Sequence, residues 1–123
     1  MEVICEVMEL KQENRKDYIN LHNNTWPELV KALRDSGFLE EYIFILKNIV
    51  ILFMKCENFE KSKSKLAQTD IYKKWTSLVR KMLLKHPAFF ESDDLLLDLE
   101  PVWRLDCFDE EGFLKTKCIH KKD

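Results

Sequence analysis

The feature that most limits the possible folds is a pair of neighbouring runs rich in β-branched and aromatic residues. These runs are YIFIL at 42–46 and IVILFMKC at 49–56. Lys47-Asn48 separates them, and Asn tolerates the positive φ of a tight turn, so the runs are predicted to form a β-hairpin. Side chains alternate between the two faces of a strand, and here both faces are mostly apolar. A sheet with helices on one side and water on the other would alternate apolar and polar residues instead. We therefore expect a sheet that is buried on both faces.

The other segments predict how that sheet is covered. Residues 3–10 and 95–105 are predicted strands, and residues 13–36, 57–68 and the segment after Thr69-Asp70 are predicted helices. This order is that of an α+β, ferredoxin-like, split-βαβ protomer over residues 1–105, with a polar C-terminal extension at 106–123. The helices can cover only one face of the sheet. A second copy of the sheet is the economical cover for the other face, so we expect a homodimer packed sheet to sheet.

Composition excludes several classes of protein. A chain of 123 residues is expected to be one domain, and its net charge of −2 gives no reason to expect a nucleic-acid partner. No segment reaches the roughly 18 uninterrupted apolar residues of a membrane span. The N-terminus lacks the pattern of a signal peptide, so the cytoplasm is the expected location. The four cysteines are far apart and form no C-x-x-C pair, so free thiols are expected there.

The segment YINLHNNTWPEL at residues 18–29 contains two aromatic residues, a histidine, an adjacent pair of asparagines and a proline close together. Pro27 cannot lie deep inside a helix, so one helix should end near His22 and a second should start at Thr25, with Thr25 and Glu28 spaced as a capping box. A histidine at such a junction can face a cleft, and its ordinary pKa near 6.5 suits proton transfer at neutral pH. The alternative, that His22 merely satisfies a carbonyl at a helix end, stays open.

Aromatic residues around His22 suggest the kind of ligand. Tyr18 lies one helical turn before His22, Tyr42 opens the hairpin, and Trp75 falls in the later helix. A pyranose offers apolar C–H faces and hydroxyl edges, which aromatic walls and one titratable group suit well, although each aromatic taken singly is equally a core residue. His86 and His120 are given no functional role. We find no glycine-rich phosphate loop, no H-E-x-x-H, no G-x-S-x-G and no metal-spaced cluster, so neither a metal nor a cofactor is expected.

The segment at residues 18–29 resembles the signature of the L-rhamnose mutarotases. Similar matches follow in order at residues 42–46, from Thr69-Asp70 to Trp75, and at LEPVWRL, residues 99–105. The resemblance implies a dimeric α+β barrel and a cofactor-free exchange between the α and β anomers of a 6-deoxy-hexose, in the first place L-rhamnose. It assigns the proton-donor position to His22 and substrate-binding positions to Tyr18, Tyr42 and Trp75. Thr76 stands where the family commonly has a second Trp, and we include it as a substrate-binding residue.

The implied mechanism has His22 protonating the ring oxygen and taking the proton back on closure. A second acid/base group is required in principle, and the sequence does not identify it. Three alternatives remain open: an L-fucose mutarotase, a haem-degrading or small-molecule monooxygenase on the same fold, and a non-catalytic sugar-binding module.

Overall fold

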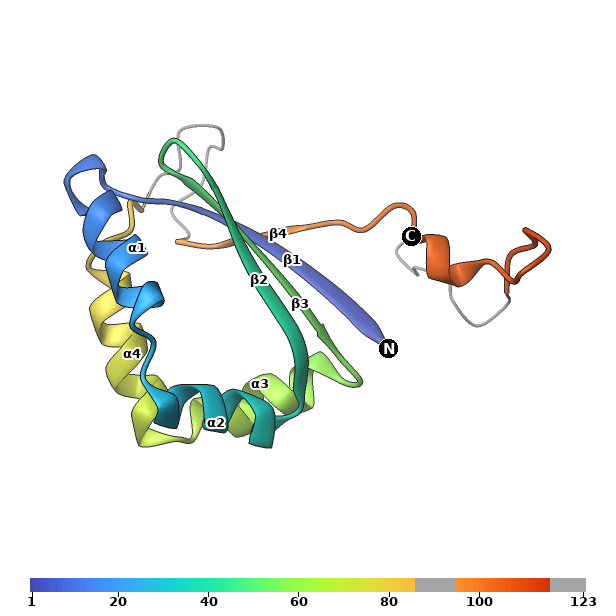
Figure 1. Cartoon of the computed structure of the whole chain (residues 1–123), viewed down its shortest axis with the longest axis horizontal. Coiled ribbons are helices and arrows are strands. Elements are labelled where there is room, and N and C mark those ends of the chain that lie inside the picture. Colours follow the sequence, from blue (N-terminus) through green and yellow to red (C-terminus); the bar gives the residue numbers. More distant parts are fainter. Residues whose placement is uncertain (86–94, 116–123) are drawn as a thin grey trace.

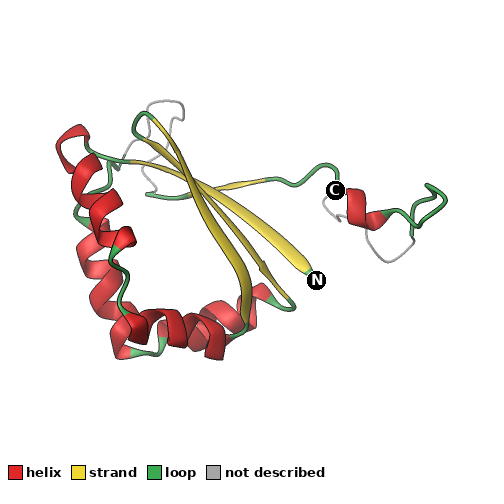
Figure 2. Cartoon of the chain, viewed as in Figure 1, coloured by secondary structure: helices red, strands yellow, loops and turns green. Residues whose placement is uncertain are grey.

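The computed structural model describes residues 1–85 and 95–115, so His86 and His120 lie outside the described residues. Helices gather along one side of the strands (Figures 1 and 2). Within the described ranges, no helix is long and apolar enough to cross a membrane. In chain order the elements are β1 (Glu2–Glu9), η1 (Gln12–Asn14), α1 (Arg15–Asn23), α2 (Pro27–Ser36), β2 (Phe38–Leu46), β3 (Ile49–Cys56), α3 (Phe59–Ala67), α4 (Asp70–Arg80), β4 (Leu97–Leu99) and η2 (Leu105–Cys107).

The four strands form one sheet in the order β2-β3-β1-β4, and each neighbouring pair is antiparallel. The two central strands, β1 and β3, are joined by a full register from Glu2 opposite Cys56 to Glu9 opposite Ile49. This strand order with helices on one face is the ferredoxin-like arrangement, so the predicted α+β fold class is confirmed.

A β-bulge near the start of β2 decides which side chains face the helices. Phe38 lies opposite Cys56, whereas Glu40 lies opposite Lys55, so Leu39 is an additional residue on β2. Because of this extra residue, Phe38 and Glu41 both face the helices, instead of Phe38 and Glu40. Beyond the bulge, Tyr42 pairs with Phe53 on the opposite face of the sheet.

The predicted break in the first helix is confirmed, since α1 ends at Asn23 and α2 begins at Pro27. The predicted capping box is wrong, because Trp26 is the N-cap residue and no side chain caps α2. The hydroxyl of Thr25 instead donates to the carbonyl of His22 at 2.5 Å. Thr69 caps α4 as expected, with its Oγ1 accepting from the backbone N–H of Tyr72 at 3.3 Å.

Two turns depend on left-handed backbone. Gly37 ends α2 with a φ of 110°, which glycine adopts without the steric cost that a Cβ brings. In the hairpin between β2 and β3, Lys47 has the positive φ, at 55°, and not Asn48, as the prediction had placed it. The hairpin itself forms as expected.

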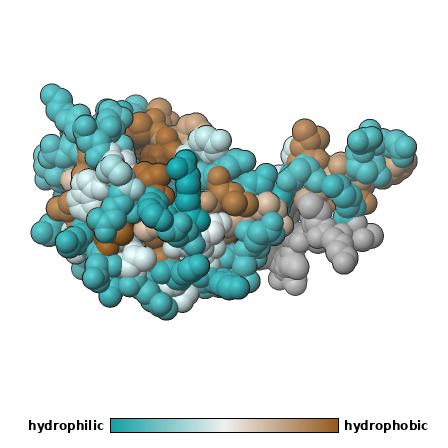
Figure 3. Space-filling view, turned by 60° about the horizontal axis from the view of Figure 1, so that its bottom comes forward, coloured by the Kyte–Doolittle hydropathy of each residue, from teal (hydrophilic) through white to brown (hydrophobic). Residues whose placement is uncertain are grey.

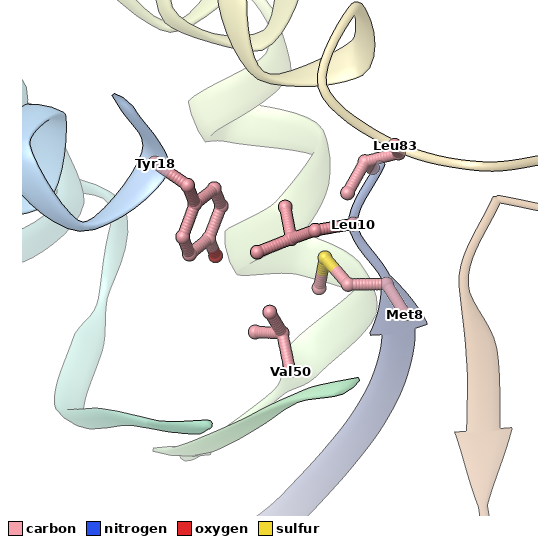
Figure 4. Packing of buried hydrophobic residues seen from close by; sticks show 5 residues of the cluster. All are labelled: Met8, Leu10, Tyr18, Val50 and Leu83. Carbon is pink, nitrogen blue, oxygen red and sulfur yellow. The ribbon is translucent and has the colours of Figure 1, made fainter. Parts of the chain in front are cut away.

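Among the residues that the structure describes, the core between helices and sheet contains two clusters. One brings together the fully buried Leu10 and Val50 with Met8, Tyr18 and Leu83 (Figure 4). The other consists of Phe38, Met54, Cys56 and Leu66. The first cluster packs α1 and the end of α4 onto the central strands. This packing fixes the position of the end of α1 relative to the sheet.

The predicted final strand at residues 95–105 is shorter in the structure. Of those residues, Leu97–Leu99 pairs with β1, whereas Pro101 lies beyond the strand and lacks the N–H that would continue it. Residues 100–115, which we call the C-terminal arm, extend away from the body of the protein (Figures 1 and 3). Arg104 connects the arm to the body by donating to the carbonyl of Met1 at 3.0 Å.

The cysteines only partly follow the expectation of free thiols. Cys5 and Cys56 are free. Cys107, which is buried within the C-terminal arm, is disulfide-bonded, so the expectation is wrong for this residue.

The first core cluster predicts a large effect of truncation at Leu10, which is 0% exposed. We expect Leu10→Ala to lower the free energy of unfolding by about 2–5 kcal/mol, because it removes buried methyl groups and leaves a cavity. Urea denaturation at fixed protein concentration measures the change. Leu78→Ala, at a site that is 39% exposed, is the matched control and should cost clearly less. Equal losses in the two variants would contradict the assignment of Leu10 to the core.

Candidate functional site

A cavity of about 320 Å³ lies between the end of α1, the start of α2, strand β2 and helix α4. This volume is at the lower end of the range, roughly 300–1,000 Å³, that ligand pockets occupy. Apolar side chains form most of the wall, and a few polar groups face the space between them. The lining residues are His22, Thr25, Leu29, Val30, Leu33, Glu41, Ile43, Tyr72 and Trp75.

The imidazole of His22 is held in one tautomer. Its Nδ1 lies 2.8 Å from the backbone carbonyl oxygen of Tyr18. A carbonyl can only accept, so Nδ1 carries the proton and donates it to this bond. Burial lowers the pKa of His22 below its ordinary 6.5, an effect that the bond to Tyr18 opposes. At neutral pH the ring is therefore uncharged, and its Nε2 carries a lone pair that no hydrogen bond within the described residues occupies.

Aromatic rings hold this imidazole on two sides. The ring centroid of Tyr18 is 4.2 Å from that of His22, and the ring of Trp75 meets His22 edge-on at 5.1 Å. Trp26 in turn meets Trp75 edge-on at 5.1 Å. These contacts leave the imidazole little freedom to rotate, so its free nitrogen has a defined direction.

The structure brings together some of the residues that the sequence singled out and separates others. His22 and Trp75 line the cavity. Tyr18 lies directly behind His22, but its ring is buried in the core and is not part of the wall. Thr76 lies on α4 next to Trp75, yet it is not in the wall either, and its hydroxyl donates to the carbonyl of Lys73.

Tyr42 faces away from this cavity. Its pairing with Phe53 places it on the sheet face opposite the helices, where it is 51% exposed. There its ring lies 6.5 Å from that of Phe44 and 6.1 Å from that of Phe53. Within one chain, Tyr42 therefore does not meet His22.

Two polar residues of the wall were missed from the sequence, Tyr72 and Glu41. Tyr72 precedes Trp75 by three residues on α4, a helical spacing that could have indicated it. Glu41 shares its strand face with Ile43, so alternation counted backwards from Ile43 would have found it. Burial, and then the charge of Glu6, raise the pKa of Glu41 to about 7.

Glu6 on β1 is the second acidic residue of the helix-covered sheet face with a strongly raised pKa. Burial, followed by the charge and hydrogen bond of Asp98, raises its pKa to about 7. Asp98 lies opposite Glu6 in the pairing of β1 with β4. Among the residues that the structure describes, no group of three or more His, Cys, Asp or Glu side chains could hold a metal ion.

Comparisons with known proteins agree with the fold and with the sequence signature. The family model of L-rhamnose mutarotase matches residues 3–105. The L-rhamnose mutarotase of Clostridium beijerinckii is 30% identical over 100 residues, which are 80% of this chain and 92% of that protein. The crystal structure of L-rhamnose mutarotase FA22100 from Formosa agariphila superposes with a TM-score of 0.66 at 27% identity, over 85% of this chain and 98% of that chain.

The same fold also occurs in a protein with a different name. The crystal structure of an antibiotic biosynthesis monooxygenase superposes with a TM-score of 0.57 at 13% identity, over 83% of this chain and 99% of that chain. At this identity the likeness concerns the fold alone.

The raised pKa of Glu6 makes stability depend on pH. Glu6 stays protonated in the folded chain up to pH about 7 but ionises in the unfolded chain near its ordinary 4.5. The unfolded state then binds fewer protons, so this residue's contribution to the free energy of unfolding falls as the pH rises from about 4.5 to about 7. We expect Glu6→Gln to flatten this fall, as measured by urea denaturation across that window. In both proteins the raised pKa of Glu41 contributes a fall of the same sign, and the lowered pKa of His22 acts in the opposite direction.

The difference between wild type and Glu6→Gln is therefore the quantity to compare. Glu13→Gln, at an exposed residue in η1, is the control for loss of one carboxylate. An identical pH dependence for wild type and Glu6→Gln would show that this carboxyl is not perturbed by folding.

Proposed function

We propose that this chain, which belongs to the L-rhamnose mutarotase family, interconverts the α and β anomers of a 6-deoxy-hexose, in the first place L-rhamnose. Membership of the family makes the chain an isomerase of the mutarotase type. The choice of sugar within that class is our proposal. It is supported by the names of its relatives, since the protein from Formosa agariphila is also described as an L-rhamnose mutarotase.

The observation that carries the proposal is a neutral imidazole fixed at the wall of an aromatic and apolar cavity. Trp75, Tyr72 and Ile43 offer apolar surface to the C–H faces and the methyl group of a deoxy-sugar. The Nε2 of His22 offers a proton acceptor to a hydroxyl group. A small space with few polar groups suits a monosaccharide better than a large or highly charged ligand.

The tautomer of His22 suggests the direction of the first proton transfer. Exchange between anomers requires the sugar ring to open, rotate about one bond and close again. With Nδ1–H donated to Tyr18, the neutral ring begins by accepting the proton of the anomeric hydroxyl at Nε2. On closure it returns that proton. This order differs from the expectation that His22 first protonates the ring oxygen, which a neutral imidazole with a free Nε2 is less suited to do.

We also propose that the active form is a homodimer. The sheet face opposite the helices, which we call the outer sheet face, exposes Tyr42, Phe44 and Leu46 at 51%, 61% and 69%. The C-terminal arm adds Val102 and Trp103, exposed at 82% and 64%. Exposed apolar side chains gathered on one sheet face mark interfaces, and a second copy of the same sheet would cover them on both protomers. Tyr42 would then belong to the dimer interface.

Loss of His22 is expected to abolish most of the exchange. For His22→Gln we expect the enzyme-catalysed rate between the anomers of L-rhamnose to fall on the order of 10²- to 10⁴-fold, because the amide cannot accept a proton at neutral pH. Saturation-transfer NMR measures this rate, with L-fucose in a parallel series. Asn20→Ala, at an exposed residue two positions earlier, is the control for folding. Full activity of His22→Gln would contradict the proposed role.

A charge on the outer sheet face is expected to prevent dimer formation. Light scattering after gel filtration measures the molar mass in solution. Wild type should have twice the 14.8 kDa mass of one chain, and Phe44→Glu should have the mass of one chain. The reason is that the buried carboxylate would lack a partner in an apolar interface. Leu78→Glu introduces the same charge on α4 and should remain dimeric. A dimeric Phe44→Glu would place the interface elsewhere.

A further inference from the structure

Opening a pyranose ring requires two proton transfers, and His22 accounts for one of them. A base must take the proton from the anomeric hydroxyl, and an acid must give one to the ring oxygen. The neutral His22 ring offers a lone pair at Nε2, while its N–H is committed to the carbonyl of Tyr18 at 2.8 Å. The site therefore needs a proton donor besides His22, placed on the same cavity.

Glu41 occupies such a place. It comes from strand β2, whereas His22 comes from the end of α1, and both line the cavity of about 320 Å³. The bulge at Leu39 directs Glu41 to the helix-covered face, where it lies opposite Met54 in the sheet. The residue as a whole is accessible to solvent, in keeping with a position on an open wall, while neighbouring atoms around its carboxyl partly desolvate that group. No hydrogen bond or ion pair engages its carboxyl within the described residues, so the group is available to a ligand.

The surroundings of Glu41 favour the protonated acid. Leu33, Ile43 and Trp75 are among its neighbours in the wall and offer it no charge. The groups that interact with it electrostatically are Glu6 from β1, Tyr18 from α1 and Tyr72 from α4. Arg34 of α2 borders the adjoining groove together with Glu41. His22, the remaining titratable group of the wall, is neutral. Partial desolvation of the carboxyl, and then the charge of Glu6, raise the pKa of Glu41 to about 7, so a large fraction carries a proton at neutral pH.

We propose that Glu41 is the second acid/base group of this site and exchanges a proton with the sugar ring oxygen while His22 exchanges one with the anomeric oxygen. This inference rests on the proposed function. It assigns the chemistry to two groups on different elements, one on a helix end and one on a strand. The space between them is where the sugar would lie.

The proton transfers balance without a cofactor. On opening, the anomeric O–H proton passes to Nε2 of His22, the bond between the anomeric carbon and the ring oxygen breaks, and the ring oxygen takes the proton of Glu41. The open-chain aldehyde then lies between an imidazolium and a carboxylate. After rotation about the bond next to the aldehyde, the former ring oxygen attacks the other face of the carbonyl. Its proton returns to Glu41, and the carbonyl oxygen takes the proton of His22.

The test compares wild type, Glu41→Gln and Glu41→Asp by saturation-transfer NMR on L-rhamnose, with kcat measured from pH about 5 to about 9. In wild type, kcat should rise as His22 loses its proton and fall above pH about 7 as Glu41 ionises. Glu41→Gln should lower kcat on the order of 10²- to 10⁴-fold and remove the fall at alkaline pH. Glu41→Asp keeps a carboxylic acid on a shorter side chain, so it should retain part of the rate and an alkaline fall.

Glu13→Gln is the matched control for loss of one carboxylate and should match wild type at every pH. If wild type and Glu41→Gln gave the same kcat and the same alkaline fall, while His22→Gln remained inactive, the role of Glu41 would be refuted and the proposed function would stand. A raised KM with unchanged kcat in Glu41→Gln would likewise refute proton transfer, since it would indicate binding alone. If wild type exchanged the anomers of neither L-rhamnose nor L-fucose, the proposed function would fail, and the inference with it.

Discussion

The hydrogen bond from Nδ1 of His22 to the carbonyl of Tyr18 decides the chemistry of the whole site. It selects one tautomer of the imidazole and so leaves Nε2 as an acceptor. The bond exists because both residues lie on one face of α1, one turn apart, and because the chain leaves the helix soon after His22, at Asn23. Pro27 starts the next helix and leaves room at the junction for a cavity. The residues at this break between α1 and α2 thus form part of the cavity wall.

Strand β2 contributes to two different surfaces. Its inner face adds Glu41 and Ile43 to the cavity, while its outer face exposes Tyr42 and Phe44. Side chains on a strand alternate strictly, so neighbouring residues serve different purposes. Any residue inserted into or deleted from this strand changes both surfaces together. The same alternation explains the apolar residues on both faces of β2. One face packs against the helices, and the proposed second protomer would cover the other.

Much of the fold followed from local patterns. Strand and helix order, the break near His22 and the cap at Thr69 were all predicted correctly, since each depends on spacing or on a proline. The sequence also singled out His22 and Trp75, which line the cavity, because helical spacing and side-chain chemistry are both visible in the sequence. What failed depended on tertiary structure. Tyr42 was assigned to the pocket because the covered face of β2 cannot be read from a run that is apolar on both faces. The short β4 and the absent capping box are likewise outcomes of packing and pairing.

The bulge at Leu39 has one more consequence. If β2 ran regularly from Phe38, the phenol of Tyr42 would project among the helices and the carboxyl of Glu41 would project outward. The carboxyl opposite Met54 would then be that of Glu40, and Tyr42 would take the place of Ile43 opposite Leu52, with every helix left in place. In a strand of this kind, one inserted or deleted residue exchanges several wall residues at once, whereas a point substitution exchanges one.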